Sequence, residues 1–553
     1  GARAAAPRQQ QRQARQALRQ VEQGASTQPL AARARTHART HARTHARPAG
    51  AAAVPESKGT FLLCWPTARE RATASRPASQ PGCRTPAVDI ASQAAQHSTA
   101  QRSPGNLTKA MAALEALPSV GTVTGAPLSE PAWVLGEASP YYTQAHEDFR
   151  KKVRAFVDAH IAPFVDEWDE TGTYPRDIHR RAYEAGVYGA VWPREHGGTP
   201  PPGGELPDGS LCAFMDAIWM DELARCGSGG ALAAVFIACC IAVPPILSVG
   251  SQALKERVAR PCIRGDKIIC LAITEPWAGS DVAALRTTAV RAGDGSGDFI
   301  LSGEKKFITS GMKADFFVVA CRTGGKGIGG ISLLLVERER PGIECRRMKT
   351  QGWLASNTAY IVFNDVRVPA SNMIGAENQG FLPIMLQFNH ERLVGCVTSN
   401  RFARTCLSEG ITYAQQRRTF GQRLIDHQLI RHKITEMARM VEANQAWIEQ
   451  VCYEMNRSRI TGEGDAMGLK MGGKLALLKV QTTKTYEFCA REASQIMGGA
   501  SYLREGKGRV VERLYREVRV NAIGGGSEEV MGELAIRGLG VWDGGDKKRG
   551  SKE

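Results

Sequence analysis

The sequence predicts an α+β protein in which a helical domain is followed by a small β domain and then by a helical bundle. Apolar residues recur at helical spacing from about residue 141 to 264, and the period shifts towards two from about 267 to 368. Helical spacing returns at about 381 and continues to about 540. We therefore expect an extension at 1–135, a helical domain at 136–268, a β-barrel or sandwich domain at 269–378, a four-helix bundle at 379–541 and a tail at 542–553.

The expected extension has the composition of a disordered segment. The simple repeat RTHARTHARTHAR occupies Arg35 to Arg47, and Ala, Arg, Gln, Ser and Pro dominate the residues around it. An Arg-rich, acid-poor stretch is typical of a mitochondrial transit peptide, and a translated leader without function is the alternative. We expect a location in the mitochondrial matrix, with the peroxisome and the cytoplasm as alternatives.

The net charge of +16 is concentrated in the first 110 residues, which carry 17 Lys and Arg against 4 Asp and Glu. These residues account for +13, so only +3 remains for residues 111–553. A protein that binds nucleic acid through its globular part needs an excess of basic residues there. We therefore expect no nucleic-acid partner.

The expected N-terminal helical domain begins with an amphipathic pattern from Ala145 to Trp168. Further on, the run from Ala231 to Val249 is about as long and apolar as a membrane-spanning helix, but it contains Pro244 and Pro245. Proline removes a helical hydrogen bond, so we expect the helix to break there. We interpret this run as a buried core helix and expect no membrane span.

The expected β domain contains a series of strand-like runs separated by Gly and Pro. The segment DFILSGEKKFIT predicts a hairpin that turns near Ser302 to Glu304. Four further β-rich runs cover 314–323, 330–338, 343–350 and 358–368.

Fourteen cysteines are present, but no two are spaced as C-x-x-C and no histidine cluster accompanies them. We interpret them as reduced and mostly buried thiols of an intracellular protein, and we expect no metal site.

Two motifs in the β domain carry the strongest chemical signal. The first is TEPWAGSD from Thr274 to Asp281, where small residues let backbone N–H groups approach a ligand closely. The second is Phe307-Ile308-Thr309, an aromatic and two β-branched residues on a strand. A flat ring system with a phosphate tail needs both kinds of surface.

Together these motifs resemble the TEPxAGSD and W/F-I-T signatures of the acyl-CoA dehydrogenase family, and the resemblance extends over about residues 140–541. It implies the three-domain fold of that family and an FAD cofactor. The residues that it places around the flavin are Leu271, Ile273, Thr274, Gly279 and Ser280 on one side, and Phe307, Ile308 and Thr309 against the ring.

Two later motifs imply that a second subunit completes the cofactor site. Residues 415–430 resemble the family's R-x-T-F-G-x-x-L-x-x-x-Q, in which Arg417, Phe420 and Gln428 would reach the cofactor of a neighbour. In QIMGG, Gln495, Gly498 and Gly499 would hold its adenosine pyrophosphate end, and Ser501 departs from the glycine usual there. The resemblance thus implies a homotetramer or a homodimer.

The position at which the family usually carries its catalytic base holds no carboxylate. Many family members carry it as the Glu of a C-terminal Y-E-G-T/S motif, but the matching position here is Gly525. The chain is then either an inactive homologue or one with its base elsewhere. Isovaleryl-CoA and long-chain acyl-CoA dehydrogenases carry the base in a helical E-R-L motif, which Glu391 and Arg392 match.

The residues around Glu391 support that second interpretation. Phe388 and Val394 lie at i−3 and i+3, so a carboxylate on this apolar helix face would be desolvated and its pKa raised. An exposed Glu-Arg pair on an amphipathic helix is the alternative. His390 lies about 100° round the helix and is assigned no role.

Glu528 and Glu529 are the rival candidates for the base, because they begin the last expected helix, where carboxylates favour the macrodipole. The family uses the region from Ser527 to Glu529 for flavin contact. We expect the N–H of Gly525 to donate to the thioester oxygen. The resemblance implies that Ser280, Arg392 and Gly524 contact the substrate.

The expected activity is FAD-dependent conversion of an acyl-CoA to its trans-2-enoyl-CoA, with Glu391 as the base and an electron-transfer flavoprotein as the electron acceptor. An acyl-CoA oxidase that uses oxygen is one alternative, but oxidases of this superfamily usually carry a further C-terminal domain. A flavin-binding homologue without activity is the other.

Overall fold

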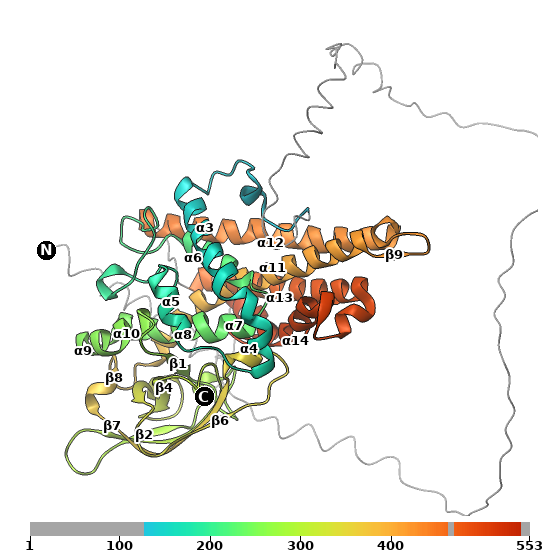
Figure 1. Cartoon of the computed structure of the whole chain (residues 1–553). Coiled ribbons are helices and arrows are strands. Elements are labelled where there is room, and N and C mark those ends of the chain that lie inside the picture. Colours follow the sequence, from blue (N-terminus) through green and yellow to red (C-terminus); the bar gives the residue numbers. More distant parts are fainter. Residues whose placement is uncertain (1–126, 463–468, 543–553) are drawn as a thin grey trace, which may run out of the picture. The chain divides into compact units, whose positions relative to one another are not determined.

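The computed structural model describes residues 127–462 and 469–542, and the first 126 residues of the expected extension and most of the expected tail, 543–553, lie outside them. Within the described part, a helical region is followed by a sheet domain and a second helical region (Figure 1). The first region contains α3 (Gln144–His160), α4 (Val165–Thr171), α5 (Ile178–Glu184), α6 (Ala213–Ala224), α7 (Gly229–Leu232), α8 (Ala238–Val249), α9 (Gln252–Leu254) and α10 (Arg260–Ile263).

The middle domain is one eight-stranded sheet with the order β6-β7-β3-β2-β4-β5-β8, in which β1 pairs with β4 in parallel. Its strands are β1 (Ile269–Ala272), β2 (Thr288–Arg291), β3 (Phe299–Ile308), β4 (Phe316–Arg322), β5 (Ile331–Glu337), β6 (Ile343–Arg347), β7 (Ala359–Val368) and β8 (Met373–Ile374). The four β-rich runs of the sequence correspond to β4, β5, β6 and β7.

Strands β4 and β5 are buried on both faces, which explains why their sequences are continuous apolar runs. On β4, Val318 packs into the core shared with the helices, whereas its neighbour Val319 packs into the core of the sheet domain. Leu333 and Leu334 of β5 divide in the same way. Because successive residues of a strand point to opposite faces, one face of these strands packs against the helical domains and the other against the core of the sheet domain.

The hairpin expected at Ser302 to Glu304 is wrong, because β3 continues through these residues as a single strand. Gly303 has φ +148, and the register between β3 and β7 shifts between Leu301 and Gly303. A Cβ on Gly303 would lie 2.6 Å from the Cα of Thr287 on the neighbouring chain segment. The glycine therefore marks a bulge and a close approach of two backbones rather than a turn.

The expected break at Pro244 and Pro245 is also wrong, because both residues lie inside α8. Pro244 has no N–H to offer the carbonyl of Cys240, and the side chain of Gln387, from α11 (Phe381–Gln416), donates its Nε2 N–H to that oxygen at 2.9 Å instead. A partner from another helix thus satisfies the freed backbone group. In the described residues, the helical stretch Gly229–Val249 alone is long and apolar enough to cross a membrane, and 67% of its most apolar window is buried inside the protein.

The second helical region is built around long antiparallel helices (Figure 1). It contains α11 (Phe381–Gln416), a small hairpin of β9 (Arg418–Thr419) and β10 (Gln422–Arg423), α12 (Gln428–Thr461), α13 (Leu469–Met497), α14 (Arg509–Ile523) and α15 (Glu528–Gly538). Helix α13 packs against α11, α12, α14 and α15. Gly472 of α13 allows a close approach to α11, because a Cβ there would lie 3.1 Å from Asn389 Oδ1.

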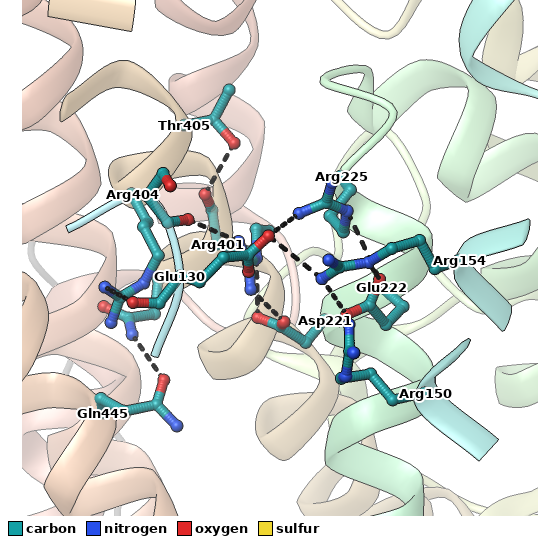
Figure 2. A network of polar contacts seen from close by, with 12 residues as sticks. Glu130, Arg150, Arg154, Asp221, Glu222, Arg225, Arg401, Arg404, Thr405 and Gln445 are labelled. Carbon is teal, nitrogen blue, oxygen red and sulfur yellow. Dashed lines mark hydrogen bonds and ion pairs between the residues drawn. The ribbon is translucent and has the colours of Figure 1, made fainter. Parts of the chain in front are cut away.

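The described structure begins inside the expected extension, since residues 127–135 are part of it and hold a buried charge. Glu130 is 6% exposed and forms ion pairs with Arg154 at 3.1 Å, with Arg401 at 3.1 Å and with Arg225. Figure 2 shows these groups converging from several elements. Glu130 lies in a stretch of low apolar periodicity, where nothing in the local sequence indicates that it is buried. Its partners come from elsewhere in the chain, namely from α3, the end of α6 and α11.

The network extends on both sides of Glu130 (Figure 2). Arg154 of α3 binds Glu222 of α6 through two hydrogen bonds of 2.8 and 2.6 Å. Arg401 of α11 donates to Asp221 of α6 at 2.9 Å, and Arg404 of α11 binds Glu442 of α12 at 2.6 Å. Paired charges therefore tie four helices together in the interior.

Candidate active site

The segment TEPWAGSD forms a tight turn directly after β1. The backbone of Glu275 pairs with that of Ala278 in both directions, at 2.9 and 3.3 Å. Gly279 and Ser280 beyond the turn are exposed, and a Cβ on Gly279 would meet nothing within 4 Å. The turn thus presents its small residues on an open surface, as a ligand that approaches the backbone requires.

A buried ion pair that the sequence analysis missed supports this turn. Lys305 of β3 is 0% exposed and donates to Glu275 Oε1 at 2.8 Å and to the carbonyl of Ile273 at 2.9 Å. The carboxylate of Glu275 also accepts from the N–H groups of Arg286 at 2.6 Å and Thr287 at 2.9 Å. Glu275 therefore stabilises the turn from within. The only indication of this role in the sequence was an acidic residue between two turn-forming residues.

The second motif lies at the end of β3, beside the same turn. The backbone N–H of Lys306 donates to the carbonyl of Thr274 at 2.8 Å, so the two motifs are joined by main chain. Phe307 is 57% exposed at φ +61, and Thr309 is half-buried. The ring of Phe307 is thus free to cover a ligand in the turn.

Ile308 does not share this surface. Its side chain is 2% exposed and belongs to the core of the sheet domain, because neighbouring strand residues point to opposite faces. The side chain of Ile308 is therefore not on the surface that Phe307 presents, and the expected contact of Ile308 with the flavin would be through its backbone. Ile273 is also buried, at 7% exposure, while Leu271 and Thr274 are half-buried.

The residues expected to bind a neighbour's cofactor lie at a different part of the chain. The hairpin β9–β10 projects from the end of the α11–α12 pair, away from the sheet (Figure 1). The turn after α13 is at the same end, since Lys507 donates to Gln416 Oε1 at 2.9 Å. The exposed members of this set are Arg417, Phe420, Gln428, Gln495, Gly498 and Gly499. One chain alone does not bring them to the TEPWAGSD turn.

Glu391 lies in the first third of α11, where it is half-buried and close to the turn between α14 and α15. Burial raises the pKa of Glu391, and the nearby positive charges of Arg392, Lys479 and His390 oppose this effect without cancelling it. A carboxyl group with a raised pKa holds a proton well once it has taken one.

The structure brings Glu391 and Gly525 together. A Cβ on Gly525 would lie 3.5 Å from Glu391 Oε1, so the residue that vacates the usual base position is in contact with the residue that would replace it. The two positions are 134 residues apart in sequence, and α11 and the turn between α14 and α15 meet here. Gly525 has φ +66, and none of the described residues accepts a hydrogen bond from its N–H.

Glu528 and Glu529, the other candidates for the base, have different hydrogen-bond partners and exposure from Glu391. Glu528 accepts a hydrogen bond from Thr483 of α13 at 3.1 Å. Glu529 is exposed, and hydrogen bonds from its own backbone N–H and from Ser527 lower its pKa. Ser527 is the N-cap residue of α15 and is half-buried. The pKa of Glu529 is thus shifted away from the range that suits a base, whereas burial raises that of Glu391.

The neighbours of Glu391 on α11 have partners of their own. Arg392 is 8% exposed and donates to Asn389 Oδ1 at 2.8 Å, while its buried Nε has no partner among the described residues. His390, to which we assigned no role, binds Asp216 of α6 at 2.7 Å. Asp216 and His390 line a cavity of about 200 Å³ together with Trp192, Leu211 and Arg459, among others. Gly524 is exposed beside Gly525.

These surfaces fit an FAD cofactor in their chemistry. The flavin ring needs an exposed aromatic neighbour, which Phe307 provides, and the phosphates need glycines with open space, which Gly279, Gly498 and Gly499 provide. No group of three or more His, Cys, Asp or Glu in the described part of the chain could hold a metal ion. The twelve described cysteines are free thiols, and all except the half-buried Cys345 are buried.

Three family models match the chain in succession. The N-terminal domain of acyl-CoA dehydrogenase matches residues 143–266, the middle domain residues 270–366 and the C-terminal domain residues 378–540. They cover the described helical, sheet and helical regions in the order in which these occur.

Similar proteins agree with these matches. The chain is 36% identical to acyl-CoA dehydrogenase AFT10-1 of Alternaria alternata over 414 residues, which is 74% of this chain and 95% of that one. It is 32% identical to the mitochondrial isobutyryl-CoA dehydrogenase of Bos taurus over 399 residues, or 72% and 89% of the two chains. The crystal structure of a probable acyl-CoA dehydrogenase from Mycobacterium abscessus superposes with a TM-score of 0.65 at 40% identity, covering 72% of this chain and 99% of that one.

The matches cover nearly all of the described chain, and the motifs that they share lie on the surfaces described above. The chain therefore belongs to the acyl-CoA dehydrogenase family, whose members are FAD-dependent oxidoreductases that act on CH–CH donors.

Proposed function

We propose that this protein converts an acyl-CoA thioester to its trans-2-enoyl-CoA, with Glu391 as the base that removes the α-proton. The observation that carries the proposal is the contact between Glu391 and Gly525, in which a Cβ on the glycine would lie 3.5 Å from Glu391 Oε1. A base on α11 can therefore serve the same point in space as a base at position 525. In this proposal, the glycine at position 525 is compatible with activity.

The raised pKa of Glu391 suits this role. A proton α to a thioester is weakly acidic, and a carboxylate whose pKa is raised by burial is a stronger base towards it than a solvated one. Substrate that fills the site would expel water and raise the pKa further. Bound FAD supplies the hydride acceptor for the β-carbon, which no side chain can replace.

Gly525 has a separate task in this proposal. As the α-proton leaves, negative charge develops on the thioester oxygen and needs a donor in place. The N–H of Gly525 is free among the described residues and lies beside the base. We assign it to that oxygen, and we assign Arg392, Gly524 and Ser280 to substrate binding.

A second copy of the chain completes the cofactor site. The exposed set around Arg417, Phe420 and Gln495 lies at the far end of the bundle from the TEPWAGSD turn, and Phe420 is 98% exposed. We propose a homodimer or homotetramer in which these residues reach the neighbour's FAD. Equilibrium sedimentation of the FAD-loaded protein tests it, and a monomer that retains FAD would contradict it.

The electron acceptor in this proposal is an electron-transfer flavoprotein, in keeping with relatives that are named dehydrogenases. An oxidase would pass the electrons to oxygen. Stopped-flow reoxidation of the reduced protein separates the two: reoxidation in air slower than turnover supports the flavoprotein, and reoxidation at the turnover rate supports the oxidase.

The central test is anaerobic bleaching of the flavin by a panel of acyl-CoAs. We expect bleaching with at least one of them, and a loss of about 10²- to 10⁴-fold in its rate in Glu391→Gln with FAD retained. Glu409→Gln is the matched control, because Glu409 lies on the same helix and burial raises its pKa too. Bleaching by Glu391→Gln at the parent's rate would eliminate Glu391 as the base.

Gly525→Glu in the Glu391→Gln background asks whether one carboxylate can act from either position. The new Cβ makes ordinary contacts, and φ +66 costs a non-glycine residue roughly 1–2 kcal/mol. We expect partial recovery of flavin bleaching. No recovery in a folded, FAD-loaded double variant would show that the two positions are not equivalent.

We also propose that the protein acts in the mitochondrial matrix, on the Arg-rich, acid-poor composition of its first 110 residues. Import of the full chain into isolated mitochondria, followed by protease protection, tests this. A chain that stays accessible to protease under conditions that import a control precursor would contradict it.

A further inference from the structure

The turn that carries Gly525 is held by a single buried side chain. Lys479 of α13 is 3% exposed, and its Nζ donates to the carbonyl oxygens of Gly524 at 2.8 Å, Ala522 at 3.3 Å and Gly526. An ammonium group has three donors, so all of them are used on this turn. The residues on both sides of Gly525 are thereby attached to α13.

The backbone of this turn has little else to select its conformation. Gly525 has φ +66 and Gly526 has φ +108, so both occupy a region that glycine enters easily and leaves easily. Without Lys479, a run of three glycines would connect α14 to α15 with few restraints. The direction of the Gly525 N–H therefore depends on the lysine.

Lys479 also acts on the charge of Glu391. The charged groups that face Glu391 are His390 and Arg392 from its own helix and Lys479 from α13. Burial lowers the pKa of Lys479 to about 8, Cys396, Glu391 and Glu528 oppose this effect, and Arg392 adds to it. Within the described part of the chain, Lys479 is thus the one charged group from a neighbouring element that bears on the proposed base.

We propose that Lys479 is a positioning residue that aims the Gly525 N–H at the reacting thioester and supplies the positive charge that keeps Glu391 available as a carboxylate. This inference rests on the proposed function of Glu391 and Gly525. Lys479 touches neither substrate nor cofactor in it, and acts through the turn and through its charge. A lysine that only caps the end of α14 would share the hydrogen bonds but would leave the titration of Glu391 unaltered.

The first test compares Lys479→Met with the parent. The expected result is retained FAD, a rate of anaerobic flavin reduction by acyl-CoA that falls by about 10²-fold, as when one donor to a developing oxyanion is lost, and a midpoint of the pH–rate profile that moves to higher pH. The midpoint moves upward because removing a positive charge disfavours the carboxylate. A slower reaction with an unmoved midpoint would reduce Lys479 to a helix cap and overturn the proposal, as would an unchanged rate.

Two further variants separate charge from structure. Lys479→Arg keeps the charge and should restore the midpoint even where its larger planar group recovers the rate only in part. Lys474→Met is the matched control, because Lys474 lies on the same helix and its ion pair, with Glu454 at 2.5 Å, is on the α12 side. If Lys479→Met loses FAD, Lys479→Gln, which keeps amide donors without the charge, is measured instead, and an unmoved midpoint there overturns the proposal.

A thermodynamic cycle tests the charge without any turnover. Thermal unfolding is followed as a function of pH for the parent, Lys479→Met, Glu391→Gln and the double variant, all without acyl-CoA. Between pH 7 and the Lys479 pKa of about 8, where the lysine still carries its charge, we expect Lys479→Met to change the melting temperature more in the parent than in the Glu391→Gln background, which lacks the carboxylate. Equal effects in both backgrounds overturn the proposal. If instead no acyl-CoA reduces the parent flavin, the proposed function fails while this cycle still reports on Lys479.

Discussion

Glu130 and Glu391 are two glutamates in the interior of the same helical assembly, and their surroundings shift their pKa values in opposite directions. Burial would raise the pKa of Glu130, but the charges of Arg401, Arg225 and Arg154 outweigh it and lower the pKa to about 2. At Glu391 burial outweighs Arg392, Lys479 and His390, and the pKa is raised. Positive groups lie near both carboxyl groups, so the way they are paired matters.

The difference lies in how the positive groups are used. The three arginines around Glu130 form ion pairs with its two oxygens, as Figure 2 shows for this network. Around Glu391, the ammonium of Lys479 is engaged with carbonyls of the Gly525 turn, Arg392 donates to Asn389, and His390 binds Asp216. A buried carboxylate that forms ion pairs holds the helices together, whereas one whose positively charged neighbours bind other groups can exchange a proton.

The largest effect expected from this difference follows the removal of a partner from the Glu130 network. Arg401→Met should lower the free energy of unfolding by about 3–5 kcal/mol, because it leaves the buried Glu130 and the half-buried Asp221 incompletely paired. Urea titration measures it. Arg439→Met, which removes an exposed ion pair with Glu436, is the control and should change little. A loss no larger than the control's would mean that the network contributes no stability.

A third buried glutamate extends the comparison to pH. Glu517 of α14 accepts from the N–H groups of Gly229 at 2.7 Å and Gly230 at 3.2 Å, and burial raises its pKa to about 7 despite Arg513. The native state therefore holds this proton more tightly than the unfolded chain, whose glutamate has a pKa near 4.5. Its contribution to stability is complete below pH 4.5 and is lost as the pH rises through 7.

Glu517→Gln should remove that part of the pH dependence, which amounts to up to about 3 kcal/mol. Urea unfolding at intervals between pH 5 and 8 measures the slope. Glu512→Gln on the same helix is the control, because its carboxylate is bound by Arg516 at 2.6 Å. If the free energy of unfolding of the variant falls with pH as steeply as that of the parent, another group is responsible for the pH dependence.

A smaller effect concerns the stability cost of the base itself. Because the pKa of Glu391 is raised, its ionised form destabilises the native state above that pKa, and Glu391→Gln should raise the free energy of unfolding at pH 8 by on the order of 1 kcal/mol. The same substitution in the paired position, Glu130→Gln, should lower it. If both substitutions lower the free energy of unfolding, the ionised Glu391 stabilises the fold as Glu130 does.

The smallest effect is expected at an exposed carboxylate. Glu529→Gln should leave the melting temperature close to the parent's and slow flavin bleaching far less than Glu391→Gln does, because Glu529 is exposed and its pKa is lowered by local hydrogen bonds and by the charges of Arg519 and Lys484. Differential scanning calorimetry and stopped-flow absorbance measure the two. A bleaching rate that falls as far as in Glu391→Gln would return Glu529 to the candidates for the base.

The predictions from sequence succeeded where the signal was periodic or local. Helical spacing and period two indicated the order of the three domains, and TEPWAGSD with Phe307 and Thr309 indicated the family and its cofactor. The hairpin at Gly303 and the break at Pro244 were wrong for a common reason. In each case a contact with another part of the chain explains why the element continues: Gly303 leaves room for the backbone of Thr287, and Gln387 donates to the carbonyl that Pro244 leaves unpaired.

The class of the chain and the two positions on which its chemistry depends could be read from the residues alone. The absence of a carboxylate at Gly525 and its presence at Glu391 are facts of the sequence, since motifs record which residues a reaction needs. The packed helices were needed to establish that these positions touch, that Lys479 holds the turn between them, and that Glu130 is a tie rather than an acid. Burial and pairing depend on which helices pack together, and that information is distributed over residues hundreds of positions apart.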